Sequence, residues 1–429
     1  MYDMRALAKM IGELEDQLVV CMRCGMCQAV CPVYSRTGLE ADVARGKLAL
    51  LEGLFKQLFD NPGGVRRRLD RCLLCGSCQA GCPSGVPVLE IFIKARAILA
   101  AFAGLDPARR LILRGMLARP ELTDRLARWA GRLQKILTRP ASDILDTSCP
   151  RLVSPLLGGR HVKNIAGRPF HRRLARLDLP RGQSGYKAAF FVGCLLDKLY
   201  PDTAMAVVRV LEKLGVGVLV PAGQGCCGIP ALAAGDTDTF RRLARHNLRL
   251  FEEGDWDFLV TACATCTWTI SRLWPMLAGT GREELVRAYE NLGRKTLDIS
   301  QFLVDEIGVG ADAASLTAPL VTYHDPCHLK KSLGVWTQPR TLINAAGRRL
   351  VEMEKADACC GMGGSFNVKY YRLSRQIGDL KRDRIVSTGA EIVATSCPAC
   401  MTQLCDLHSR AGDDIQVKHV IDLLAAALP

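Results

Sequence analysis

Eighteen of the twenty cysteines in this 429-residue chain stand in short, repeated spacings that suit metal ligation. Two segments carry the spacing C-x₂-C-x₂-C-x₃-C-P, which holds four-iron clusters in pairs. The two runs are Cys21, Cys24, Cys27 and Cys31, then Cys72, Cys75, Cys78 and Cys82. Loops of two residues let three successive thiolates converge on one iron–sulfur cube, and the proline then turns the chain away.

The fourth cysteine of each such run serves the cluster of the other run. We therefore predict two [4Fe-4S] cubane clusters with crossed ligands. The first is assigned to Cys21, Cys24, Cys27 and Cys82, and the second to Cys72, Cys75, Cys78 and Cys31. A structural zinc protein is the alternative, but zinc takes four ligands in two pairs, not two runs of four.

The other ten site cysteines form an internal repeat, with a Cys-Cys-Gly (CCG) turn in each copy. The first CCG set is Cys194, Cys226, Cys227, Cys263 and Cys266, and the second CCG set is Cys327, Cys359, Cys360, Cys397 and Cys400. Matching cysteines lie 133 or 134 residues apart, which core packing of free cysteines does not explain. Five thiolates are one more than a cubane or a zinc ion needs. Either each copy holds an unusual cluster with bridging thiolates, or one cysteine is spare.

The segments between these cysteines predict the scaffold that positions them. Three apolar stretches in each copy alternate with helical patterns, at 188–193, 216–220 and 257–261, and at 318–323, 349–353 and 391–395. Such alternation predicts βα repeats with a mostly parallel sheet. The ligand crevice of such a sheet lies beyond the carboxyl ends of the strands, where each group of cysteines follows.

Several residues near the cysteines have candidate supporting roles. Gly228 and Gly361 follow the paired cysteines, where two adjacent thiolates facing one cluster need unusual backbone angles. His324 and His328 flank Cys327 and are interpreted either as ligands or as donors to thiolate sulfur. The two remaining cysteines, Cys149 and Cys405, are interpreted as an inert thiol and a packing residue.

The fold class predicted from these patterns is α/β with an α-rich N-terminus. A helical ferredoxin-like domain with two [4Fe-4S] clusters is followed by two duplicated CCG domains. A helix predicted at 43–59 favours this helical type of ferredoxin-like domain. The expected limits are 1–100 for the ferredoxin-like domain, 101–185 for a helical linker, and 186–310 and 311–429 for the two CCG domains.

The formal charge of +14 does not indicate a nucleic-acid partner. If eighteen thiolates bind four cluster cores of about +2 each, the net charge falls to about +4. The basic runs at 66–68 and 171–181 lack the interleaved aromatic residues of a single-strand-binding platform. No apolar run is long enough for a transmembrane segment, and the first residues lack signal-peptide features. We expect a cytoplasmic protein, or one held peripherally at the inner face of the cell membrane.

The two four-cysteine runs followed by two CCG domains resemble the iron–sulfur subunit of glycolate oxidase. The corresponding subunits of anaerobic glycerol-3-phosphate dehydrogenase and heterodisulfide reductase are also similar. The resemblance extends over nearly the whole chain and includes all eighteen cysteines. It implies one or two non-cubane [4Fe-4S] clusters at the CCG sets. The terminal C-x-x-C is often degenerate in the glycolate oxidase type, whereas both copies are intact here, which favours heterodisulfide-reductase or lactate-type relatives.

The resemblance implies an oxidoreductase subunit that transfers electrons within a glycolate or D-lactate dehydrogenase complex. No flavin or nicotinamide fingerprint is visible in the sequence. The organic step is therefore expected on an FAD-containing partner subunit, with a quinone or another carrier as the acceptor. The alternative function is heterodisulfide-reductase-like, with disulfides reduced at the CCG clusters.

Overall fold

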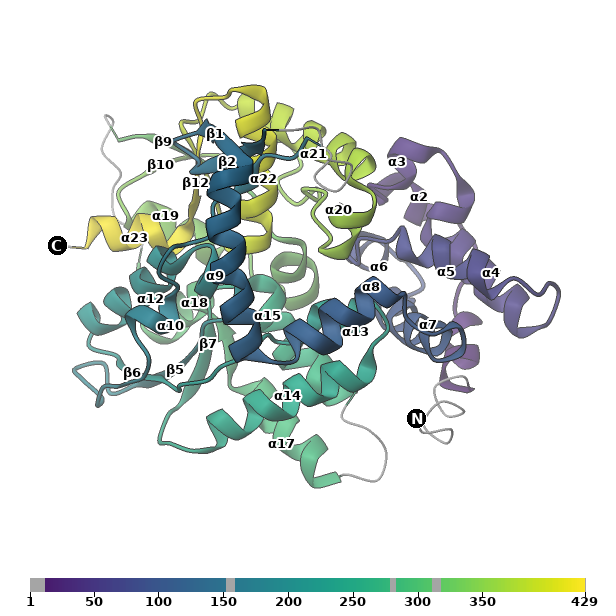
Figure 1. Ribbon diagram of the computed structural model, residues 1–429, viewed down its shortest axis with the longest axis horizontal. Helices are drawn as coiled ribbons and strands as arrows, with labels where there is room; N and C mark the ends of the chain where they lie inside the picture. The colour runs from purple at the N-terminus through teal and green to yellow at the C-terminus, as the bar shows by residue number, and fades with distance from the viewer. Residues whose placement is uncertain (1–11, 152–158, 278–282, 311–317, 429) are drawn as a thin grey trace.

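The computed structural model describes residues 12–151, 159–277, 283–310 and 318–428. In Figure 1 the helical N-terminal part (purple) lies at one side of the molecule, and two α/β parts (teal, then green to yellow) lie beside it, with the connecting segment (blue) running across them. The predicted fold class is confirmed. The predicted domain limits stay predictions.

The ferredoxin-like domain is built of short helices around one long one. Its elements are α2 (Met26–Val30), α3 (Tyr34–Thr37), η1 (Glu40–Asp42), α4 (Ala44–Phe55), α5 (Pro62–Asp70), α6 (Ser77–Ala80) and α7 (Val88–Ala103). The helix predicted between the cysteine runs is present as α4. Helix α7 is largely buried, with twelve of its sixteen residues buried. It continues as far as Gly104 because no glycine or proline interrupts it. It is the central helix of this domain.

The first CCG domain contains a five-stranded sheet. Its strands are β4 (Leu177–Asp178), β5 (Lys187–Phe191), β6 (Gly217–Val220), β7 (Phe258–Thr261) and β8 (Thr296–Asp298), in the order β4-β6-β5-β7-β8. Its helices are α11 (Cys194–Lys198), α12 (Pro201–Lys213), α13 (Ile229–Ala233), α14 (Thr237–Glu252), α15 (Ala264–Trp268), η3 (Thr269–Leu273), α16 (Trp274–Met276), α17 (Glu283–Arg294), α18 (Ile299–Gln301) and η4 (Phe302–Glu306). All strand pairs are parallel except that of the edge strand β4.

The second CCG domain repeats this order with four strands. They are β9 (Leu320–Tyr323), β10 (Arg349–Val351), β11 (Ile392–Thr395) and β12 (Gln416–His419), in the order β10-β9-β11-β12. Its helices are η5 (His328–Ser332), α19 (Gln338–Ala345), α20 (Ser365–Lys369), α21 (Tyr371–Val386), α22 (Pro398–Ala411) and α23 (Val420–Ala427). The three strands predicted in each copy are confirmed. The fourth strands, β8 and β12, were not predicted.

The two CCG domains share one apolar core. Helix α23 of the second domain packs on α12 of the first, and α18 of the first packs on α19 of the second. Val207, Ile299, Ile343 and Ile421 are fully buried in this shared cluster. The reciprocal packing fixes the two sheets relative to each other and therefore also fixes the relative position of the two CCG sets.

The connecting segment differs from the helical linker that the sequence predicts. It contains α8 (Pro107–Arg110), η2 (Leu111–Leu117), α9 (Pro120–Leu137) and α10 (Phe170–Arg173), but also a small sheet of β1 (Thr138–Ser142), β2 (Thr147–Pro150) and β3 (Val162–Lys163). Helix α9 crosses the front of the molecule in Figure 1. None of the helices in the described ranges has the length and apolar content needed to cross a membrane.

Candidate iron–sulfur centres

The two four-cysteine runs adopt the same backbone conformation. In each run, the residue before the second cysteine is left-handed, with φ 59° at Arg23 and 54° at Leu74. The glycine after that cysteine is also left-handed, at Gly25 and Gly76, and begins a short helix that carries the third cysteine. Non-glycine residues seldom adopt this conformation, and where they do the strain is often associated with a functional site. In each run this left-handed backbone conformation directs the three thiols toward one point.

The structure brings the fourth cysteines to the opposite runs. Cys82 lines one small cavity together with Cys21, Cys24 and Cys27, and Cys78 of the second run also borders this cavity. Cys31 instead lies beside Cys72 and Cys75, and the pKa of its thiol is raised to about 11, chiefly by burial and further by these neighbours. This arrangement agrees with the crossed assignment, which remains a prediction of ligation.

The first CCG set converges beyond the carboxyl ends of β5, β6 and β7. Cys194 begins α11, Cys226 and Cys227 form the turn before α13, and Cys263 is the N-cap of α15. The Sγ atoms of Cys194 and Cys226 are 3.8 Å apart. Neighbouring Cys226 and Cys266 hold the pKa of Cys227 well below its usual value. Cys266 in turn lies beside Cys263, so all five thiols of this set lie in one group.

The second CCG set has the same construction. Cys327 precedes η5, Cys359 and Cys360 precede α20, and Cys397 is the N-cap of α22. Cys360 lies beside Cys359, Cys400 and His324. These neighbours lower the pKa of its thiol, Cys359 the most and His324 the least. All five cysteines of this set are buried.

Backbone N–H groups donate hydrogen bonds to these sulfurs in the same way in both copies. Gly228 donates to Cys226 Sγ and Gly361 to Cys359 Sγ, both at 3.4 Å. In the ferredoxin-like domain, Tyr34 and Leu74 donate to Cys31 and Cys72, also at 3.4 Å. Donors aimed at sulfur stabilise thiolate ligands and tune cluster potential, so the surroundings fit iron–sulfur clusters.

Buried cations complete the sites, and no local sequence pattern singles them out. Lys331 lies near Cys327 and Cys75. Burial alone would lower the pKa of its ammonium, but these thiols together with Asp357 outweigh burial and raise it. Lys381 lies near Cys360, and burial lowers its pKa to about 8. Lys47 lies near Cys72 and Cys31. Each cation can offset the negative charge of a cluster and its thiolates.

Two thiol pairs connect the sites to one another. Cys75 of the ferredoxin-like domain lies beside Cys359, which lowers the pKa of Cys75 to about 5. Cys263 of the first CCG set lies beside Cys397 of the second. The thiols thus form a continuous series from the ferredoxin-like domain through the second CCG set to the first.

His328 lies where the three domains meet. Its Nε2 is 2.9 Å from the carbonyl oxygen of Leu74, and its Nδ1 is 3.1 Å from Thr265 Oγ1. Its ring stacks on Trp268 with 4.2 Å between ring centroids. Both ring nitrogens are therefore engaged with protein groups, which makes His328 a link between domains and leaves it no free atom for metal.

The CCG turns require glycine, and replacing Gly361 by alanine should abolish the second turn. Gly361 has φ +90°, and a Cβ there would lie 2.4 Å from the carbonyl oxygen of Ser374. The left-handed conformation costs a residue with a Cβ about 1–2 kcal/mol, and the backbone clash adds to this. We expect Gly361→Ala to lose about four irons, the content of one cluster, by colorimetric iron assay.

Gly167→Ala is the matched control for this variant. A Cβ at Gly167 meets no atom within 4 Å, and its φ is not positive. It should keep the wild-type iron content. Full iron content in Gly361→Ala would show that the turn does not position ligands.

Two different family models match the ferredoxin-like domain and the two CCG domains of the chain. A family model described as a cysteine-rich domain matches residues 188–271 and 321–405. A model described as a 4Fe-4S dicluster domain matches residues 17–86. These segments hold all eighteen site cysteines.

Three relatives illustrate the similarity over longer ranges. A Bacillus subtilis protein named "Probable glycolate oxidase iron-sulfur subunit" is 29% identical, over 96% of this chain and 94% of its own length. "Lactate utilization protein A" of an Exiguobacterium species is 34% identical, over 55% of this chain and 96% of its own length. A Methanothermobacter marburgensis protein, named as one of the subunits of fumarate reductase (CoM/CoB), is 29% identical, over 95% of this chain and 72% of its own length.

The fold, the cysteine sets and these matches define an iron–sulfur protein with a dicluster domain followed by two CCG domains. Within this class, the chain belongs to the glycolate oxidase iron–sulfur subunit family. The relatives are named as subunits or components of oxidoreductase systems.

Proposed function

We propose that this chain is the electron-transfer subunit of a flavin-dependent glycolate or D-lactate dehydrogenase complex. An FAD-containing partner subunit oxidises the 2-hydroxy acid, and a quinone or another carrier receives the electrons. The observation that carries the proposal is the continuous series of thiols, connected by Cys75 beside Cys359 and by Cys263 beside Cys397. A chain with several adjoining one-electron sites and no fingerprint for a two-electron cofactor suits conduction between partners.

The cofactors proposed are two [4Fe-4S] cubanes and two further non-cubane [4Fe-4S] clusters. The cubanes take the crossed ligands given above, and the non-cubane clusters take the first and second CCG sets. When bound, these clusters supply reversible one-electron redox chemistry.

The chain's own residues give the clusters a suitable environment. Burial of nine of the ten CCG cysteines excludes water from the sulfurs. Lys331, Lys381 and Lys47 place positive charge beside the thiolates, and the N–H donors of Gly228 and Gly361 fix their orientation. A fixed, dry and charge-compensated environment needs little rearrangement when an electron arrives.

The test is anaerobic purification of the chain together with its natural flavoprotein partner. The complex should reduce an artificial dye with glycolate or D-lactate, and the substrate should also bleach the visible absorption of the clusters in this chain. Dye reduction by the flavoprotein with no change in cluster absorption would overturn the proposal.

A second candidate is reduction of a disulfide at the CCG clusters. It is favoured by the intact C-x-x-C pairs of both copies, Cys263 with Cys266 and Cys397 with Cys400. The similar Methanothermobacter protein, whose name refers to CoM and CoB, points the same way. Disulfide reduction by the purified chain with an artificial donor and no flavoprotein would establish this function in place of the first.

A further inference from the structure

His324 is a buried histidine with no hydrogen-bonding partner for its ring. It follows β9, is fully buried, and neither ring nitrogen has a partner among the described residues. Leaving buried polar atoms unpaired costs about 1–3 kcal/mol each. Its backbone N–H donates a hydrogen bond to the carbonyl oxygen of Ala394 at 2.9 Å. The groups that the imidazole does face are thiols of the second CCG set, since it helps to lower the pKa of Cys360.

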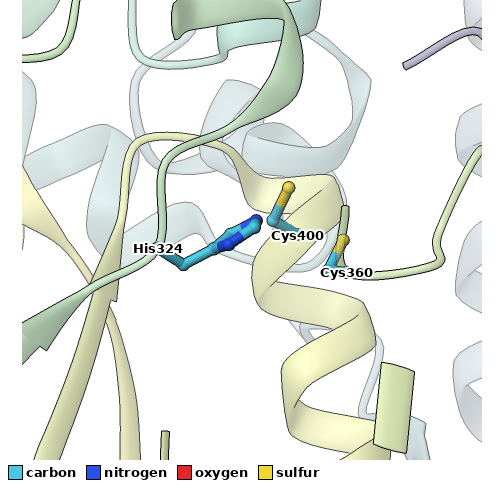
Figure 2. Close-up of side chains that lie close together, drawn as sticks. All are labelled: His324, Cys360 and Cys400. Carbon is cyan, nitrogen blue, oxygen red and sulfur yellow. The ribbon is translucent and has the colours of Figure 1, made fainter. Parts of the chain in front are cut away.

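The imidazole is aimed at two cysteines of the second CCG set. A ring nitrogen of His324 and the Sγ atoms of Cys360 and Cys400 all lie within 4.8 Å of one another. Figure 2 shows the ring pointing from the end of its strand toward these two sulfurs, one on helix α22 and the other on the CCG turn. One nitrogen and two sulfurs at this separation can reach a common metal ion.

The fold itself does not require a histidine here. The equivalent residue of the first copy, 133 positions earlier, is Phe191. Its ring packs on Phe251 and Trp274, with centroids 6.0 and 6.4 Å away. A phenylalanine can therefore occupy the equivalent position of the same fold. The second copy differs from the first because it has a nitrogen donor at this position.

We propose that His324 supplies a nitrogen ligand to the metal cluster held by the second CCG set. This rests on the proposed function only in that the second set holds a cluster. The first set, with Phe191 in this place, has thiolates alone. All five thiolates of the second set are present, so the histidine is an additional ligand and does not replace a thiolate. Because ligand identity sets cluster potential, loss of the histidine should change the reduction potential of this cluster.

The test uses protein labelled with ¹⁵N-histidine and pulsed electron paramagnetic resonance of the reduced clusters. One signal should carry a hyperfine coupling of the size of a directly bound nitrogen. The His324→Phe variant should lose this coupling, and the midpoint potential of that same cluster should shift. His161→Phe is the control, because His161 bonds Ser409 and lies outside the cysteine sets; it should keep both properties.

The outcomes separate this inference from the proposed function. His324→Asn serves as a smaller polar variant if His324→Phe does not fold, and it should also lose the coupling. Full iron content without any bound-nitrogen coupling would overturn the histidine ligand alone. Absence of iron from the second CCG set, seen as an iron content unchanged by Cys397→Ser, would instead overturn the cluster assignment on which both rest.

A second inference comes from helix α9, whose polar side faces the protein. Gly131 lies against Ile165, where a Cβ would be 3.5 Å from its side chain. Gln134 donates to Ser148 Oγ at 3.1 Å and accepts from the backbone N–H of Ile165 at 3.1 Å. Asp124 pairs with His171 and Lys198. These contacts fix which face of the helix is turned outward.

The outward face of α9 is apolar, the reverse of an ordinary surface helix. Trp129, Ile136 and Leu137 are 62%, 66% and 60% exposed. Leu126 and Leu133 extend the same stripe, and Leu111 and Ile112 of the adjoining η2 are exposed as well. Along one flank of the stripe the helical spacing places a row of exposed basic residues: Arg125, Arg128, Arg132 and Lys135.

We infer that this face of α9 docks on a membrane surface containing anionic lipids. Leucine, isoleucine and tryptophan on one side of a helix, with cations beside them, fit the boundary between lipid headgroups and acyl chains. The cations match anionic headgroups, each contributing about 1 kcal/mol. Asp124 at the start of α9 also pairs with Lys198 of α11, the helix that begins at Cys194. Docking would therefore bring the first CCG set toward the membrane.

Vesicle flotation of the holoprotein tests this surface. Vesicles with about 30% phosphatidylglycerol, which gives them an anionic surface, should bind the protein. Pure phosphatidylcholine vesicles should bind it at least tenfold less. The double variant Trp129→Gln, Ile136→Gln should also bind anionic vesicles at least tenfold less. Val368→Gln, an exposed apolar residue on α20, is the control and should bind as wild type. Absence of vesicle binding, with the double variant losing the flavoprotein partner instead, would overturn the inference and make this face a subunit interface.

Discussion

The Cys360→Ser variant will lose about four irons relative to the wild-type protein, the content of one [4Fe-4S] cluster. Cys360 lies between Cys359 and Cys400 in a fully buried site. A hydroxyl there is a poor ligand for iron, and the other buried thiolates would be left without their counter-charge. Substrate-driven dye reduction by the complex should fall more than about 100-fold, beyond the effect of losing an outer partner of a ligand.

Cys149→Ser and Cys405→Ser are the matched controls for this experiment. Cys149 on β2 accepts a hydrogen bond from Arg139, and Cys405 is buried within α22. Neither belongs to a cysteine set, so both variants should keep the wild-type iron content and activity. Equal iron content in the Cys360 variant and these controls would remove Cys360 from the ligand set.

Replacing Arg96 by methionine should destabilise the junction between the ferredoxin-like domain and the first CCG domain. Its buried guanidinium donates to the carbonyl oxygens of Leu69, Cys72 and Ala233, at 2.6, 2.8 and 2.9 Å. Removing it takes a donor from all three carbonyl oxygens, of which that of Leu69 keeps the backbone N–H of Cys72, and it removes one cation near Cys72, where Lys47 remains. The expected cost is about 3–5 kcal/mol. The temperature at which the clusters bleach should fall by roughly 10 °C, measured by visible absorption under anaerobic conditions.

Arg249→Met is the control that tests whether loss of any arginine lowers the bleaching temperature. Arg249 is exposed on α14, so its replacement should leave the bleaching temperature within about 1 °C of wild type, as for most surface substitutions. A bleaching temperature for Arg96→Met equal to that of Arg249→Met would show that the guanidinium does not hold the two domains together.

The cysteine pattern predicts much of the scaffold because thiolate ligation constrains both spacing and fold. Cysteines must follow the carboxyl ends of strands to converge, so the duplicated spacing locates β5, β7, β9 and β11 with their parallel pairing. The fourth strands escape prediction because segments such as Thr-Leu-Asp of β8 are too short to show a period.

Other features depend on contacts that no local pattern contains. The apolar spacing of α9 predicts a helix, but distant contacts decide which side faces the protein. Gln134 bonds to residues 14 and 31 positions away, and Gly131 packs against Ile165, 34 positions away. Lys331 becomes part of a cysteine site only through burial between two domains. His324 and His328 look equivalent around Cys327 in the sequence. The structure separates them, since only His328 has partners for both ring nitrogens.

The central claim is that the cysteine sets hold iron–sulfur clusters which form one electron path. Anaerobic purification with iron and sulfide analysis, followed by electron paramagnetic resonance during stepwise reduction with dithionite, tests it most directly. We predict a brown protein with about sixteen irons, four for each of four clusters, and signals that broaden as neighbouring clusters are reduced together. A colourless protein without bound iron, or clusters whose signals stay independent at full reduction, would contradict the claim.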